Sequence, residues 1–164
     1  MALVSFAGCA GTVATTQGYP LYKTEPARLP DNQIARLSTK LPLGAGPGAG
    51  ATSFIKAVDN RDVSTLDSIF DLLPGCHVIQ TESSFIMSNN NVTWRAQLGP
   101  RLFALEMKPA HVYFIVVELN EGMSGHGRIK VYATEEDMNG KQTGTFPPPA
   151  TLSEAMKCRP SQPL

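Results

Sequence analysis

The sequence predicts an all-β protein in which about seven strands form an antiparallel β-sandwich. Three observations lead to this prediction. Short apolar runs alternate with turn residues from about residue 51 to residue 137. The chain holds 14 glycines and 13 prolines among 164 residues, and both residue types favour turns over long helices. Few segments show the apolar repeat of about 3.6 residues that marks a helix.

Length and charge narrow the class of protein. A chain of 164 residues is long enough for one domain of ordinary size with irregular ends. Its 14 basic and 14 acidic residues cancel, so it lacks the basic excess that binds nucleic acid, and we expect no nucleic-acid partner. The longest dense apolar run, Val112–Val117, is much shorter than the roughly 18 residues of a membrane-spanning helix.

The amino terminus resembles the lipobox of bacterial lipoproteins, where a signal peptide is cut and a cysteine is acylated. The similarity lies in Phe6–Cys9, and a polar, proline-containing segment follows it. The resemblance implies a signal-peptide remnant over residues 1–8, lipidation at Cys9 and a tether over residues 9–50. Neither Lys nor Arg precedes Cys9, so a complete signal would begin upstream. The alternative is an unmodified terminus with a free thiol.

Residues 31–38, within this tether, predict a short helix. Pro30 or Asp31 can begin the helix, and Ile34 and Leu37 then share one of its faces. The glycine-rich run over residues 43–51 predicts a linker or an exposed loop, because it lacks the lysine of a phosphate-binding loop.

Seven strands are predicted after this run, and each ends at a turn signal such as Asp59-Asn60 or Pro74-Gly75. The predicted strands are Ser53–Val58, Ser68–Leu73, Cys76–Glu82, Val92–Gln97, Arg101–Lys108, His111–Asn120 and Gly127–Glu135.

Alternation along these strands predicts which faces are buried. Phe103, Leu105 and Met107 share one face, which we expect to line the core. Both faces of Val112–Val117 are apolar, so this segment is predicted to be a central strand. The acidic run Glu135–Asp137 predicts a solvated strand end.

The carboxyl end, residues 138–164, is predicted to be a proline-rich tail. Pro147–Pro149 cannot join a central strand and favours an extended polyproline conformation. The alternative is an ordered arm that lies across the domain. Within the tail, Leu152–Lys157 can form one helical turn.

The three cysteines suggest a compartment. If the chain is exported, its surroundings are oxidising, and acylation of Cys9 leaves Cys76 and Cys158 as an even pair. A disulfide between them would tie the carboxyl tail to the domain. The alternative is two unrelated thiols, with Cys76 a small buried residue in a strand. The cysteines form no C-x-x-C pair of the kind that binds zinc.

Two histidines offer the main candidate chemistry. His77 and His111 each follow a turn and begin a strand. If those strands pair in parallel, the two imidazoles approach each other, and Glu82, Glu106 or Glu118 would complete a metal site or an acid–base pair. The alternative is a structural His77 that packs against its turn and binds the backbone. No metal and no catalytic residue is assigned from the sequence.

A wider resemblance covers about residues 29–135. Ile55–Asn60 and Leu72–His77, followed by the segment from Phe103 to Tyr113, are similar to a loose group of uncharacterised bacterial envelope lipoproteins. Their pattern reads I-x-x-V-D-G, then L-x-P-G-x-H, then a strand ending in G-x-x-Y. Asn60 and Ala110 stand where that pattern has glycine. The resemblance implies a β-sandwich on a lipid anchor and implies no established activity.

Together these observations predict a cell-envelope lipoprotein. We expect a sandwich of immunoglobulin or transthyretin type over residues 51–137, facing the periplasm, with the outer membrane favoured over the inner. The expected role is non-catalytic binding or scaffolding, with the membrane and an envelope protein as partners, an unknown ligand and no cofactor. One alternative is a soluble periplasmic enzyme or metal protein using His77, His111 and a carboxylate. Another is a subunit of a secretion or adhesion assembly, which an exposed edge strand would indicate.

Overall fold

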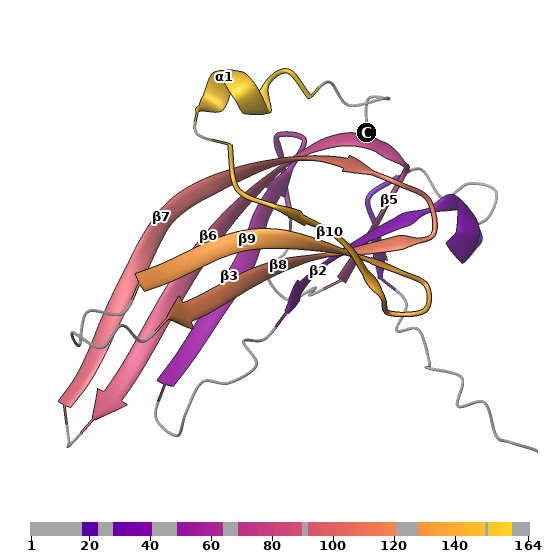
Figure 1. Ribbon diagram of the computed structural model, residues 1–164. Coiled ribbons are helices and arrows are strands. Elements are labelled where there is room, and N and C mark those ends of the chain that lie inside the picture. Colours follow the sequence, from indigo (N-terminus) through magenta and orange to yellow (C-terminus); the bar gives the residue numbers. More distant parts are fainter. Residues whose placement is uncertain are drawn as a thin grey trace, which may run out of the picture.

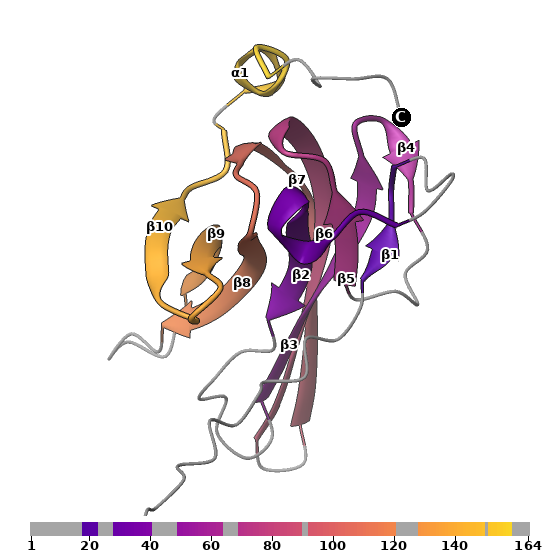
Figure 2. The ribbon, with the colours of Figure 1, turned by 90° about the vertical axis from the view of Figure 1, so that its right-hand side faces the viewer.

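The computed structural model describes residues 18–22, 28–40, 49–63, 69–89, 92–120, 128–149 and 151–158. Over these residues the protein is mostly β-strand, with two sheets and one short α-helix (Figure 1). The view turned by 90° shows the two sheets side by side, with β8, β9 and β10 on one side and β3, β6 and β7 on the other (Figure 2). The predicted all-β, sandwich-like fold is confirmed.

Each sheet combines segments that are distant in the sequence. The six-stranded sheet has the order β1 (Tyr19–Pro20), β5 (Ile69–Leu72), β2 (Ala35–Lys40), β8 (His111–Asn120), β9 (Arg128–Asp137) and β10 (Gln142–Phe146). The four-stranded sheet has the order β4 (Arg61–Asp62), β3 (Ala49–Val58), β6 (Gly75–Asn89) and β7 (Val92–Met107).

β8 lies inside the six-stranded sheet, as its two apolar faces predict. It pairs in parallel with β2 on one side and antiparallel with β9 on the other. β1 and β5 are also parallel, so this sheet is mixed, whereas every pairing in the four-stranded sheet is antiparallel.

A long hairpin forms the other sheet. β6 and β7 pair from Gly75↔Met107 to Asn89↔Val92. The two predicted strands Val92–Gln97 and Arg101–Lys108 therefore belong to one strand, with Gly99-Pro100 inside it. Proline is tolerated there because β7 is an edge strand and the register shifts at this point, where Thr81 pairs with Arg101 and Ser83 with Leu98.

The helix predicted over residues 31–38 is wrong. Only Asp31–Gln33 forms a turn of 3-10 helix, and β2 begins at Ala35. β2 finds partner strands on both sides, β5 and β8, and these non-local backbone bonds outweigh a weak helical pattern. β1 and β2 thus place part of the predicted tether within the sheet. Of the glycine-rich run predicted to be a linker or an exposed loop, residues 43–48 lie outside the described residues, and residues 49–51 belong to β3, so the prediction is wrong for those three.

The carboxyl end contains a strand that the sequence did not predict. β10 pairs antiparallel with β9 at the edge of the six-stranded sheet. After Pro147–Pro149, α1 (Leu152–Ala155) forms within the predicted helical turn. Thr151 and Glu154 make a capping box that satisfies its first backbone N–H groups.

The core lies between the inner faces of the two sheets. Phe103, Leu105 and Met107 are buried there, which confirms the predicted core face of β7. Burial of each such side chain contributes about 1.5–3 kcal/mol. The opposing sheet supplies the other half of the core, chiefly Leu37, Phe70, Leu72, Tyr113, Ile115, Val117, Val131 and Ala133.

Candidate functional site

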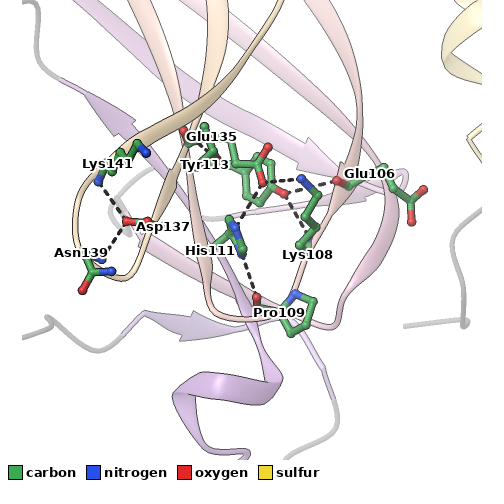
Figure 3. A network of polar contacts seen from close by, with 10 residues as sticks. Glu106, Lys108, Pro109, His111, Tyr113, Glu135, Asp137, Asn139 and Lys141 are labelled. Carbon is green, nitrogen blue, oxygen red and sulfur yellow. Dashed lines mark hydrogen bonds and ion pairs between the residues drawn. The ribbon is translucent and has the colours of Figure 1, made fainter.

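A network of polar contacts surrounds Glu135, near the end of β9 (Figure 3). Its side chain is only 2% exposed, so the carboxylate requires polar partners. Lys108 Nζ donates to Glu135 Oε1 at 2.9 Å, and His111 Nε2 lies 3.5 Å from the same oxygen. The prediction of a solvated strand end is therefore wrong for Glu135. The cause is the strand register, which sets Glu135 opposite the buried Tyr113 and turns it inward.

The turn between β7 and β8 positions both basic side chains. It crosses from one sheet to the other at residues 108–110, and Ala110 adopts a left-handed conformation with φ 60°. The Ala110 N–H donates to the Ile34 carbonyl at 2.8 Å, which ties the turn to the start of β2. His111 Nδ1 donates to the Pro109 carbonyl at 2.8 Å and so fixes the imidazole ring toward Glu135.

Tyr113 closes the inner side of the network. Its hydroxyl accepts from the Lys108 N–H at 2.9 Å and donates to the Glu106 carbonyl at 3.3 Å. Burial raises the pKa of Tyr113 to about 12, although the Lys108 N–H opposes this rise; Glu135 adds to it. The phenol is therefore a neutral link between the end of β7 and the start of β8.

Two neighbouring features complete the surroundings of the carboxylate. At Gly144 of β10 an added Cβ would lie 2.9 Å from Glu135 Oε2, so any other residue there would have to displace this carboxylate. Beyond it, Asp137 Oδ1 accepts from the Asn139 N–H at 2.9 Å and the Lys141 N–H at 3.0 Å. The Lys141 N–H is the main cause of the lowered pKa of Asp137. These bonds shape the β9–β10 turn.

The cluster contains a carboxylate, an imidazole and an amine. Its contacts connect the turn after β7 to β9, and we call this set of contacts around Glu135 the brace. The Glu135 oxygen faces two basic groups, and the His111 Nδ1 proton goes to a backbone carbonyl. Lys108 is 58% exposed and lies on the turn between the sheets. Among the described residues, no group of three or more His, Cys, Asp and Glu is placed to hold a metal ion. The Lys108–Glu135 ion pair links the two sheets at one end.

A second polar pair lies at His77, on the inner face of β6. His77 Nδ1 is 2.6 Å from Asp59 Oδ2, and Nε2 donates to the Leu73 carbonyl at 2.7 Å. Both neighbours are acceptors, so the full arrangement requires the imidazolium form. Burial lowers the pKa of His77, but the bond to Asp59, the Leu73 carbonyl and the Asp59 charge outweigh it, and the net pKa is raised.

The two predicted histidines do not meet. His77 belongs to β6 in the four-stranded sheet, and His111 to β8 in the six-stranded sheet, so their strands do not pair as the hypothesis of a shared site required. Their acidic partners are Asp59 and Glu135, not Glu82, Glu106 or Glu118. The observed surroundings of His77 match the structural alternative, in which it binds the backbone beside its turn.

Cys76 and Cys158 are joined by a disulfide, with their Cα atoms 5.3 Å apart. The bond fastens the segment after α1 to the start of β6, so it connects the end of the described chain to the four-stranded sheet. Ala155 and Cys158 are buried on this segment, whereas Leu152 and Met156 are exposed. Cys9, the predicted lipidation site, lies outside the described residues.

A third charged cluster surrounds Asp71, a buried residue of β5. Arg36 Nε donates to Asp71 Oδ1 at 3.0 Å, and Arg28 Nη2 donates to Oδ2 at 2.7 Å. Arg28 also binds the Gly18 carbonyl, and Arg36 reaches Asp31 at 2.7 Å. The cluster therefore holds the segment that contains β1 against β5 and β2.

Sequence reasoning missed Asp59, Asp71 and Glu135 as partners of buried charges. One signal was present, because Asp59 and His77 both belong to the quoted lipoprotein pattern and the structure brings them together. The other two acids carry no such signal, since strand order and register alone decide what they face.

Comparisons with known proteins identify no relative of this chain. No family model, curated protein or solved structure matches the chain. In the part of the chain that the structure describes, no helix is both long and apolar enough to span a bilayer.

Proposed function

We propose that the protein is a bacterial cell-envelope lipoprotein whose sandwich acts as a non-catalytic binding or scaffolding module. The Cys76–Cys158 disulfide carries this proposal, because such bonds persist in oxidising compartments such as the periplasm and are rare in the cytosol. The lipobox-like run that ends at Cys9 supports the same compartment. Acyl chains on Cys9 would hold the domain at the membrane surface, with the outer membrane favoured.

The chemistry of the described clusters supports a non-catalytic role. The side chains of Glu135, His77 and Asp71 all make internal polar contacts that join strands or turns. None of these contacts depends on a ligand, so the three clusters are accounted for by the architecture they stabilise.

The start of the fold limits the reach of the proposed tether. Gly18 already contacts Arg28, and β1 begins at Tyr19. Only residues 10–17 separate Cys9 from this ordered segment. At about 3.3–3.6 Å per residue, the extended tether spans about 30 Å, so an acylated protein keeps its sandwich close to the bilayer.

The deciding experiment is the intact mass of the native protein from bacterial membranes, with and without reductant. We expect a chain that begins at acylated Cys9 and that gains mass on reduction only through the hydrogens added to Cys76 and Cys158. The matched variant Cys9→Ser should move to the soluble fraction with its disulfide intact. An unmodified chain with free thiols in the cytosol would overturn the proposal.

A further inference from the structure

One stretch of β9 lacks a neighbouring strand on its outer side. β8 pairs with β9 over the whole length of both strands, from His111↔Asp137 to Asn120↔Arg128. β10 pairs only with Ala133–Glu136. Among the described residues, no strand therefore pairs with the other side of Ile129–Tyr132, here called the β9 edge. Figure 1 shows β9 continuing past the end of β10.

The protein's own chain is diverted away from the β9 edge. β10 ends at Phe146, and Pro147–Pro149 follow it. Proline has no N–H, so this segment cannot extend the ladder along β9. It leads instead to α1, after which Cys158 is fastened to Cys76 of the other sheet. The disulfide thus holds Cys158, the last described residue, at the four-stranded sheet.

A cleft of about 570 Å³ runs beside the β9 edge. It reaches from this edge across to β7, and its lining includes Ile129, Lys130, Val131, Tyr132, Arg101 and Thr145. Alternate residues of a strand point to opposite faces, so Ile129 and Val131 face the core while Lys130 and Tyr132 face outward. Side chains of an added strand would therefore contact Ile129 and Val131 on one face and Lys130 and Tyr132 on the other.

The charges beside the cleft favour an acidic ligand. Arg101 and Lys130 are both exposed, and neither has an ion-pair partner among the described residues. Glu118 stands opposite Lys130 in the β8–β9 register and also lines the cleft. Two cations and one carboxylate leave one positive charge to be matched.

We infer that the β9 edge binds an extended, acidic segment of a partner protein by β-strand addition. In an antiparallel strand, every second residue directs its N–H and C=O to the same side. The β9 edge therefore offers a short row of backbone donors and acceptors, which an incoming strand satisfies with its own. An acidic side chain on the outward face of that strand would lie beside Lys130, and one on its inward face would point toward Arg101 across the cleft, which sets the preference for charge.

The test uses the full chain with its disulfide formed and a capped synthetic peptide of about nine residues that alternates valine and threonine around two adjacent aspartates, which point to opposite faces of the strand. Binding is followed by fluorescence anisotropy and by amide hydrogen exchange. We expect saturable binding, with new protection at Ile129–Tyr132. A peptide N-methylated at alternate residues keeps the charge but loses the backbone donors, and we expect it to bind at least tenfold more weakly.

Charge reversal tests the acidic preference. Lys130→Glu and Arg101→Glu should each weaken binding of the aspartate peptide about tenfold. Each should strengthen binding of a matched peptide with lysine in place of aspartate. The control is Arg61→Glu, an exposed residue on β4 of the other sheet, which should leave both affinities unchanged. Equal binding by the N-methylated peptide, or by Lys130→Glu, would overturn the inference, as would protection of the β9 edge without peptide through self-association.

This inference rests on the proposed binding role but not on the anchor. Peptide binding is measured on soluble chain in which Cys9 need not be acylated. Failure of the peptide test would leave the mass of the membrane-bound protein unaffected, and failure of acylation would leave the β9 edge intact.

Discussion

His77 shows how a buried charge is held in this protein. Its ring lies between the Asp59 carboxylate and the Leu73 carbonyl, and Asp59 Oδ1 also accepts the Val78 N–H at 2.8 Å. The pair thereby joins the turn after β3 to the turn before β6. Asp59 and Asn60 have φ values of 50° and 65°, the positive values that a two-residue hairpin loop requires.

Replacing His77 should cost substantial stability. His77→Gln removes the imidazolium and leaves the Asp59 carboxylate buried without its charge partner, so we expect a loss of about 3 kcal/mol in the free energy of unfolding. Chemical denaturation near pH 6 measures this loss. His111→Gln is the matched control, because its side chain is 24% exposed and its carboxylate retains Lys108, so it should cost clearly less.

The same residue should make stability depend on pH. The pKa of His77 is raised in the folded protein above its ordinary value of 6.5, so the folded state binds this proton more tightly than the unfolded state does. The contribution is complete below about pH 6.5 and is lost as pH rises through the folded pKa. Unfolding free energies measured from about pH 6 to pH 9 should fall in the native protein and fall less in His77→Gln. Parallel curves would contradict this assignment.

The pairing of β9 with β10 depends on one glycine. At Gly144 a Cβ would lie 2.9 Å from Glu135 Oε2 and 3.0 Å from the Phe146 ring, so both neighbours would have to shift, and Glu135 would have to shift against its bond to Lys108. The Phe146 ring also packs on Tyr113, with centroids 6.3 Å apart. A displacement of β10 would therefore disturb the contacts around Glu135 as well.

Gly144→Ala should therefore destabilise the protein by about 1–3 kcal/mol, the usual cost of forcing an extra group into packed surroundings. Thermal and chemical unfolding measure the change. Gly99→Ala provides the control, because a Cβ at Gly99 meets nothing within 4 Å, and it should change stability little. Equal effects at the two glycines would show that β10 does not press against Glu135.

Across the whole molecule, the disulfide connects parts that the sheets alone leave apart. Its cysteines are separated by 82 positions in the sequence. Between them the chain passes through both sheets and then through Pro147–Pro149 to α1. The bond therefore restrains the unfolded chain over a long loop and keeps the carboxyl segment on the four-stranded sheet.

Removing the disulfide should lower stability by about 2–4 kcal/mol, because closure of a long loop reduces the entropy of the unfolded chain. The variant Cys76→Ser/Cys158→Ser, compared with the parent in chemical denaturation, measures this loss. Cys9→Ser is the matched control for loss of a cysteine and should leave the free energy of unfolding unchanged. A double variant as stable as the parent would mean that the bond adds no restraint.

Local pattern was a reliable guide where neighbouring residues decide the outcome. β8 begins and ends where the predicted strand His111–Asn120 does, and the two apolar faces of Val112–Val117 correctly indicated a place inside a sheet. The buried face of β7 follows from simple alternation. The turns at Asp59-Asn60 and Pro74-Gly75 follow from residues that tolerate unusual backbone angles, and Gly75 has φ 134°.

Non-local pairing overruled local pattern elsewhere. Residues 35–40 became a strand because β5 and β8 flank them. Neither partner is near in the sequence to β2, so no local window could reveal it. The two candidate histidines were separated for the same reason, since the order of strands assigned β6 and β8 to different sheets.

What the sequence alone determined was the class of fold, most strand positions and the face that lines the core, because these depend on the period of apolar residues and on turn chemistry. Only the tertiary structure decided which acids are buried beside which bases, whether Cys76 and Cys158 pair as the sequence suggested, and which stretch of strand lacks a neighbour. These features depend on strand order and register, and a shift of one residue exchanges the inward and outward side chains of a whole strand. Glu135 is the clearest case, because an acidic strand end becomes a buried brace only through its position opposite Tyr113.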